Sequence, residues 1–164
     1  MSGRAMPKQD RNNSKQDYAT PAPFIAAALA RLRINRFNFD FAADASNHKA
    51  AKYWTEKDNA LNKTPAEWAK ACRGGWGWLN PPFKDIAPWA AACAAAEDQG
   101  AHIAFLVPAS VGANWFVDSI HHRALVLGLN GRLDFIPGNH FPKDCMLCLF
   151  GPTISPGFDV WCWK

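Results

Sequence analysis

The sequence predicts one α/β domain with a compact, Rossmann-like fold in which helices flank a mostly parallel sheet. Two observations support this prediction. The 164 residues are 49% hydrophobic, which is enough for one core but hardly for two. Short apolar segments of strand length also alternate with helical segments, which is the pattern of β-α-β units in a doubly wound sheet. We expect this domain to span residues 18–164, after a flexible basic tail of residues 1–17.

The excess of positive charge lies mainly in that tail. The formal net charge is +4, and the first 16 residues hold Arg4, Lys8, Arg11 and Lys15 against the single acid Asp10. A mobile basic arm can add salt-sensitive affinity for phosphates, or it can be a solvated terminus without a partner. The body of the domain would need a local positive patch to bind nucleic acid.

The cysteine content indicates a reducing compartment, because the chain has five cysteines without a regular framework. We expect a cytoplasmic protein, since Met1–Tyr18 lacks the apolar stretch of a signal peptide. No segment approaches the roughly 18 apolar residues of a membrane helix, so no membrane partner is expected.

No metal site is expected either. Cys145 and Cys148 have a C-x-x-C spacing, but in a strand their side chains would point to opposite faces, and no second pair completes a zinc site. The adjacent His121 and His122 at a helix end are more typical of a polar surface than of a ligand set.

The first helix and strand can be placed from local signals. Thr20 and Pro21 have the residue types of a helix cap and first turn, and the helix should run to about Arg33. Aromatic and polar residues alternate over Phe37–Phe41 with the period of a strand. A tight turn and a short helix over Ala42–Ala51 would complete the first β-to-α step.

The centre of the chain predicts a strand, a turn and a helix in succession. Gly75–Leu79 has the composition of a buried strand, and Ile86–Glu97 is rich in alanine, the best helix former. His102–Val107 is a continuous apolar run suited to an inner parallel strand. The other expected elements are helices over Pro65–Ala71, capped by Thr64, and Asn114–His121, and strands over Ala124–Leu129, Arg132–Ile136, Cys145–Phe150 and, at an edge, Phe158–Trp163.

Two polar residues fall at or just after predicted strand ends. These are Asp40 and Asn80. Doubly wound sheets bind their ligands at the carboxyl ends of the strands, so we expect both side chains at one site.

The tetrapeptide Asn80-Pro81-Pro82-Phe83 carries the clearest chemical signal. The lone pair of a planar amine is delocalised, and an Asn oxygen together with the carbonyl of Pro81 can accept both amine hydrogens and sharpen the nucleophile. The prolines hold that carbonyl out of a sheet ladder, and Phe83 offers a flat face on which a flipped base could stack. These four residues are therefore candidate catalytic residues for methylation of an amine or an amide.

A structural explanation of the tetrapeptide is open at this level. Asparagine before two prolines can cap a helix whose first turn tolerates proline, with Phe83 in the core. The expected strand before the motif and helix after it favour the catalytic explanation.

Several segments carry a family resemblance, mainly Tyr18-Ala19-Thr20-Pro21, Phe39-Asp40-Phe41-Ala42-Ala43, Trp78-Leu79-Asn80-Pro81-Pro82-Phe83, Leu106-Val107-Pro108-Ala109 and Gly131-Arg132-Leu133-Asp134-Phe135. From Tyr18 to about Phe150 the sequence resembles the phage-encoded DNA adenine methyltransferase (Dam) family. The resemblance implies a fold of the S-adenosylmethionine (AdoMet)-dependent methyltransferase type, AdoMet as cofactor, and methyl transfer to the exocyclic amino group of a flipped adenine in double-stranded DNA in a bacterial host. An enzyme acting on RNA or a protein amide, or a non-catalytic DNA-binding relative, would share these features.

The same resemblance implies which residues bind the cofactor. Asp58 would lie at the adenosine end, and the other expected cofactor-binding residues are Tyr18, Thr20, Pro21, Asp40 and Ala42. The segment after Asp40 departs from many AdoMet enzymes, because it lacks a glycine-rich turn and contains the bulky Phe41.

Three residues are candidates for contact with DNA. Lys84 could meet a phosphate, Trp115 could border the base pocket, and Arg132 could meet a phosphate or a guanine edge. The structural alternatives are a solvated lysine, a tryptophan that anchors its helix, and a surface arginine in a tight turn.

Overall fold

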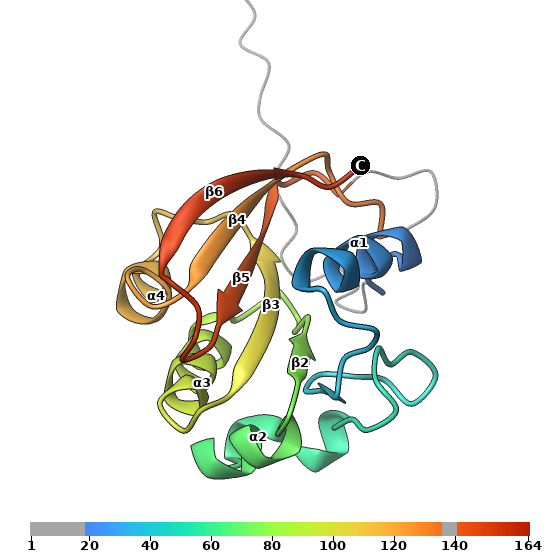
Figure 1. Ribbon diagram of the computed structural model, residues 1–164, viewed down its shortest axis with the longest axis vertical. Coiled ribbons are helices and arrows are strands. Elements are labelled where there is room, and N and C mark those ends of the chain that lie inside the picture. Colours follow the sequence, from blue (N-terminus) through green and yellow to red (C-terminus); the bar gives the residue numbers. More distant parts are fainter. Residues whose placement is uncertain (1–18, 136–140) are drawn as a thin grey trace, which may run out of the picture.

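The computed structural model describes residues 19–135 and 141–164, which form one mixed sheet with helices on both faces (Figure 1). The expected tail of residues 1–17, together with Tyr18, lies outside the described residues. The sheet has six strands in the order β1-β2-β3-β5-β4-β6. Their bounds are β1 Phe39–Asp40, β2 Trp76–Leu79, β3 His102–Pro108, β4 Leu125–Asn130, β5 Cys145–Phe150 and β6 Gly157–Cys162.

The strand directions confirm the α/β class with one refinement. Strands β1, β2 and β3 pair in parallel, as do β4 and β6, whereas β5 is antiparallel to both of its neighbours, β3 and β4. Every described strand except β5 therefore runs in one direction, and the sheet is mixed rather than purely parallel. As a result, β1 to β4 all end at the same edge, and β5 begins there.

Two packed layers cover the sheet. Strand β3 is inner and buried, and its side chains alternate: Ile103 and Phe105 belong to one core cluster, Ala104 and Leu106 to the other. Helices α2, α3 and α4 cover the first cluster, which contains Ile103 and Phe105. Helix α1 covers the second cluster, which contains Ala104 and Leu106, so α1 lies across the sheet from α3 and α4 in Figure 1. The helices are α1 Ala22–Leu32, α2 Pro65–Ala71, α3 Ala87–Glu97 and α4 Asn114–Ser119, with short 3₁₀ turns η1 Glu56–Asp58 and η2 Ala60–Asn62.

The start signals of the helices are confirmed for α2 and corrected for α1. Thr64 accepts a hydrogen bond from the Glu67 N–H at 3.2 Å, and the Glu67 carboxylate accepts one from the Thr64 N–H, which forms a capping box. The N-cap of α1 is Pro21 rather than Thr20, and no side chain caps this helix. None of the helices within residues 19–135 and 141–164 is long and apolar enough to cross a membrane.

The short helix expected within Ala42–Ala51 is absent from the structure. The chain forms a series of turns there, closed by a bridge between Asp44 and Asn47. The Asp44 carboxylate accepts hydrogen bonds from the N–H and hydroxyl of Ser46. Such local side-chain acceptors compete with the hydrogen bonds of a helix, and here they prevail.

The strand expected over Arg132–Ile136 is also wrong for residues 132–135, which have no strand assignment, while Ile136 lies outside the described residues. Leu133 and Phe135 are buried, so the alternation that suggested a strand is real. However, β4 already has β5 and β6 as neighbours, which leaves it no open edge for another strand.

Candidate active site

A cavity of about 840 Å³ lies at the carboxyl ends of β1 and β2. The structure thus brings Asp40 and Asn80 together at the edge where an α/β sheet binds ligands. Of the residues expected to bind cofactor, substrate or the reacting amine, those that line the cavity are Thr20, Asp40, Ala42, Asn80, Pro82 and Lys84.

Asn80 is bound to a residue distant in sequence. Its side-chain Nδ2 donates a hydrogen bond to the Thr20 Oγ1 at 2.9 Å, and Thr20 is only 3% exposed. Helix α3 begins at Ala87 and has Ile86 as its N-cap, so Asn80 does not cap a helix. The capping explanation of the tetrapeptide is therefore wrong.

The rest of the tetrapeptide divides between the protein interior and the cavity. Pro81 is buried, and Pro82 is exposed at the cavity. The half-buried Phe83 ring packs edge-on against Phe135 and Phe141, with ring centroids 6.1 and 5.6 Å away. Phe83 therefore belongs to an aromatic cluster and is itself only partly buried.

Asp40 organises the loop that follows β1. Its Oδ1 accepts a hydrogen bond from the Ala42 N–H at 3.2 Å, and its Oδ2 accepts one from the Lys49 N–H at 2.9 Å. The residue is 3% exposed. Burial raises the pKa of the Asp40 carboxyl above its ordinary value, although these two hydrogen bonds and the Lys49 charge oppose the rise.

The bulk of Phe41 is accommodated by a glycine on the next strand. A Cβ at Gly77 would lie 2.3 Å from the Phe41 Cε2, so only glycine leaves room for the ring. The ring also stacks on the buried Trp68, with centroids 4.3 Å apart. This packing explains how a large side chain can follow Asp40 at the wall of the cavity.

Several cavity residues were not singled out as site candidates from the sequence. Asn47, Lys49 and Asn59 line the cavity, and the Lys49 Nζ donates a hydrogen bond to the Asn47 Oδ1 at 2.7 Å. Burial lowers the pKa of Lys49, against the opposing charge of Asp40. Asn59 adopts a left-handed conformation with φ of 48° between the two 3₁₀ turns. The helix expected over Ala42–Ala51 gave no indication that Asn47 and Lys49 would reach the cavity. No other local sequence signal places these residues or Asn59 there.

Asp58 and Pro21 do not line the cavity. The exposed Asp58 carboxylate accepts hydrogen bonds from the Thr55 N–H at 2.7 Å and hydroxyl at 3.0 Å, and these bonds lower its pKa. In the structure Asp58 therefore caps η1, while its neighbours Lys57 and Asn59 reach the cavity.

The three candidates for DNA contact lie in segments at the same edge of the sheet. Lys84 is exposed at the cavity, and Trp115 is half-buried in α4, which follows the end of β3. Arg132 follows β4, and its Nε donates to the Asp144 carboxylate at 3.1 Å in an exposed ion pair. The pairing leaves the Arg132 side chain 53% exposed.

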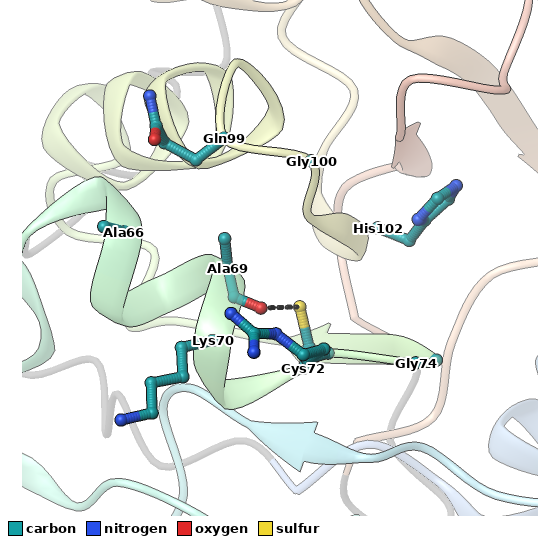
Figure 2. A pocket seen from close by; sticks show the side chains of 10 residues that line it. Ala66, Ala69, Lys70, Cys72, Gly74, Gln99, Gly100 and His102 are labelled. Carbon is teal, nitrogen blue, oxygen red and sulfur yellow. Dashed lines mark hydrogen bonds between the residues drawn. The ribbon is translucent and has the colours of Figure 1, made fainter.

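A smaller cavity of about 230 Å³ lies at the opposite edge, where β2 and β3 begin (Figure 2). Figure 2 shows the Cys72 thiol donating to the Ala69 carbonyl, at 3.8 Å, and Lys70 extending away from His102. None of the expected site residues lines this cavity.

The described residues contain no group of three or more His, Cys, Asp or Glu side chains placed to hold a metal ion. Cys145 belongs to one core cluster and Cys148 to the other, so the two thiols do point to opposite faces of β5.

The mixed sheet, the helices on both faces and a cavity lined by both polar and apolar side chains at the carboxyl edge, next to Asn80-Pro81-Pro82-Phe83, define a compact methyltransferase-like α/β protein. The chain belongs to the DNA N-6-adenine-methyltransferase (Dam) family, whose sequence model matches residues 8–144. This family assignment implies an adenine-specific DNA methyltransferase. A comparison with curated proteins gives no match.

Proposed function

We propose that the chain transfers a methyl group from AdoMet to the exocyclic amino group of adenine in double-stranded DNA, with the base turned out of the helix. The single observation that carries this proposal is the position of Asn80, which lines a large cavity at the carboxyl edge of the sheet. A base inside a duplex does not expose its amine to an enzyme cavity, so the reaction requires flipping.

The cavity suits AdoMet in size and in chemistry. Its volume of about 840 Å³ is within the usual range of about 300–1,000 Å³ for small-molecule sites. AdoMet carries an ammonium, a sulfonium, one carboxylate and a flat adenosine. In our proposal Asp40 attracts the cationic part, Lys49 binds the carboxylate, and Phe41 and Leu61 contact the apolar faces. Bound there, AdoMet would supply an activated methyl group.

The chain itself would position and sharpen the nucleophile. The Asn80 Oδ1 and the Pro81 carbonyl accept the two amine hydrogens, which draws the nitrogen lone pair out of the ring and toward the methyl group. Alignment of this kind is worth roughly 7–11 kcal/mol in well-oriented reactions. The extra proton of the product leaves to water, so no dedicated strong base is needed.

The carboxyl edge of the sheet is the proposed DNA face. In our proposal the partly exposed Phe83 ring stacks on the flipped base, and stacking of this type is worth roughly 1–3 kcal/mol per base. Lys84 and Arg132 contact phosphates or a base edge, and Trp115 borders the base. For Arg132 this requires exchange of its exposed partner Asp144 for DNA, which costs little because exposed ion pairs are worth about 0–1 kcal/mol.

Transfer of labelled methyl from AdoMet to unmethylated duplex DNA tests the proposal. The substitution Asn80→Ala should lower the rate by at least about 100-fold, the usual effect of removing one preorganised polar group, without lowering the unfolding temperature by more than a few degrees. Asn62→Ala is the matched control, because Asn62 is exposed and does not line the cavity.

Two results would refute the proposal. The first is a wild-type protein that binds AdoMet but leaves DNA unlabelled, whether or not RNA or protein takes up the label. The second is an Asn80→Ala variant that is as active as the Asn62→Ala control.

A further inference from the structure

We propose that Val111 is a wedge residue that enters the base stack of the duplex and keeps the target adenine turned out, an inference that rests on the proposed function. Val111 lies in the segment between β3 and α4, in which residues 109–112 are all exposed, and the valine itself is 51% exposed. An enzyme that turns a base out of a duplex must overcome the loss of its stacking and pairing. Apolar side chains inserted between base steps offset this loss in other DNA-binding proteins.

The segment that carries Val111 extends beyond the catalytic tetrapeptide at the same edge of the sheet. Strands β2 and β3 are parallel neighbours, with Leu79 opposite Phe105. Strand β2 ends at Leu79, whereas β3 continues for three more residues to Pro108, a rise of about 10 Å at about 3.3 Å per residue. The turn after Pro108 therefore lies further in the strand direction than Asn80, where it can meet a duplex whose adenine occupies the cavity.

Val111 is a central residue of a tight turn. The Ala113 N–H donates a hydrogen bond to the Ser110 carbonyl at 3.0 Å, so Val111 and Gly112 are the two middle residues of a β-turn. A Cβ at Gly112 would have nothing within 4 Å, so the turn is open on that side. Such turns favour Gly, Pro, Asn, Asp and Ser, and Val111 packs against neither core cluster. Neither turn propensity nor core packing therefore accounts for a valine at this position.

The turn also adjoins Arg132, one of the proposed DNA contacts. The Ala109 N–H donates to the Asp144 carbonyl at 2.9 Å, and the carboxylate of the same Asp144 accepts a hydrogen bond from the Arg132 Nε at 3.1 Å. Residues 109–113 have the sequence Ala-Ser-Val-Gly-Ala, which carries no charge and no long side chain. This segment adds no repulsion toward phosphates and lets a duplex approach closely. The wedge residue and a phosphate-binding cation thus belong to one continuous surface.

The substitution Val111→Ser tests the role, because it removes the apolar wedge and keeps a small side chain. The substrate is an oligonucleotide duplex built around an adenine that the wild type labels. Single-turnover methyl transfer to this duplex should be about tenfold slower in the variant, a change that corresponds to about 1.4 kcal/mol, because the turned-out state is less populated. The affinity for S-adenosylhomocysteine should stay within about twofold of wild type. Val111→Ile keeps the apolar bulk and should retain most of the rate.

Val160→Ser is the matched control for this substitution. Val160 is exposed to a similar extent, 60%, and lies in β6, at the edge of the sheet opposite to β1. The control should label the duplex within about twofold of the wild-type rate. Because Val111 is exposed, Val111→Ser should also unfold within a few degrees of the wild type. The wedge role is overturned if Val111→Ser labels the duplex as fast as Val160→Ser does.

A second duplex separates a wedge from a general DNA contact. In this duplex the target adenine faces an abasic position, so turning it out costs less, and Val111→Ser should label it within about twofold of wild type. An equal deficit on both duplexes would overturn the wedge role, because a general contact acts on both alike.

The wild-type protein separates this inference from the proposed function. If the wild type labels no DNA, the proposed function falls and the wedge role falls with it. If the wild type labels DNA and Val111→Ser is equally active on the fully paired duplex, the wedge role alone falls.

Discussion

The substitution Gly77→Ala would test whether the contact between β2 and Phe41 shapes the cavity. A Cβ at Gly77 would lie 2.3, 3.0 and 3.2 Å from three atoms of the Phe41 ring, closer than van der Waals contact allows. The ring cannot retreat freely, because it is 1% exposed and stacked on Trp68. Overpacking of this kind costs about 1–3 kcal/mol, occasionally more.

For a chain of this length, that cost corresponds to a fall in unfolding temperature of roughly 3–10 °C. Because Phe41 also lines the cavity, its displacement should weaken AdoMet binding as well. Thermal unfolding and calorimetric titration with S-adenosylhomocysteine measure the two effects. Gly128→Ala is the control, since a Cβ there would meet its nearest neighbour, the exposed Phe158, only at 3.4 Å.

A compensating substitution makes the test specific. Leucine at position 41 lacks the Cε2 and Cζ atoms that a Cβ at Gly77 would approach most closely. Phe41→Leu alone should destabilise the protein, because it leaves a space, but the double variant should be more stable than the sum of the two single effects predicts. Additive effects, or a Gly77→Ala protein as stable as Gly128→Ala, would refute the reasoning.

Two further predictions concern ionisable groups. Burial raises the pKa of Asp40 above 3.8, so its contribution to stability is present below the unfolded pKa and is lost as pH rises through the folded pKa. Urea unfolding from about pH 3 to 7 should show the wild type losing stability relative to Asp40→Asn as pH rises, and a constant difference would contradict this. Cys162 is exposed, whereas burial raises the pKa of the other four thiols, to about 12 for Cys145. One thiol of the native protein should therefore react promptly with a disulfide reagent. Prompt reaction of two thiols would contradict this prediction.

The parts of the fold that the sequence predicts well are those with a strong local signal. The helix α2 with its cap at Thr64 and the apolar strand β3 both lie at the positions predicted from the sequence. The antiparallel insertion of β5 was missed because its six residues are all buried, and a fully buried strand has the same apolar pattern in either direction. The strand expected after Gly131 failed for a related reason, since only the sheet order shows that β4 has no free edge.

The residues of the candidate site likewise divide into those that a local sequence signal predicts and those that it does not. Asp40 and Asn80 are predictable because Asp40 ends β1 and Asn80 follows β2, and parallel strands bring their carboxyl ends to one edge. Lys49 and Asn59 belong to turns whose course depends on a hydrogen bond to the Asp40 carboxylate and on a left-handed residue, and neither leaves a periodic pattern. The role of the Thr20 hydroxyl was mistaken for a cap, because its partner is 60 residues away.

Two tryptophans at the end of β6, Trp161 and Trp163, pack against the helix that follows Thr20, the hydrogen-bond partner of Asn80. Phe24 of α1 packs on Trp161 and Trp163, at and just beyond the end of the edge strand β6, with ring centroids 5.7 and 5.1 Å away. The Trp163 indole is itself fixed, since its Nε1 donates to the Gly131 carbonyl at 2.7 Å. Both tryptophans lie beyond the residues that the family model matches, yet they hold the helix whose start carries Thr20. The position of Thr20, and with it the hydrogen bond to Asn80, therefore depends on packing against the opposite edge strand of the sheet as well as on the strand that precedes Asn80.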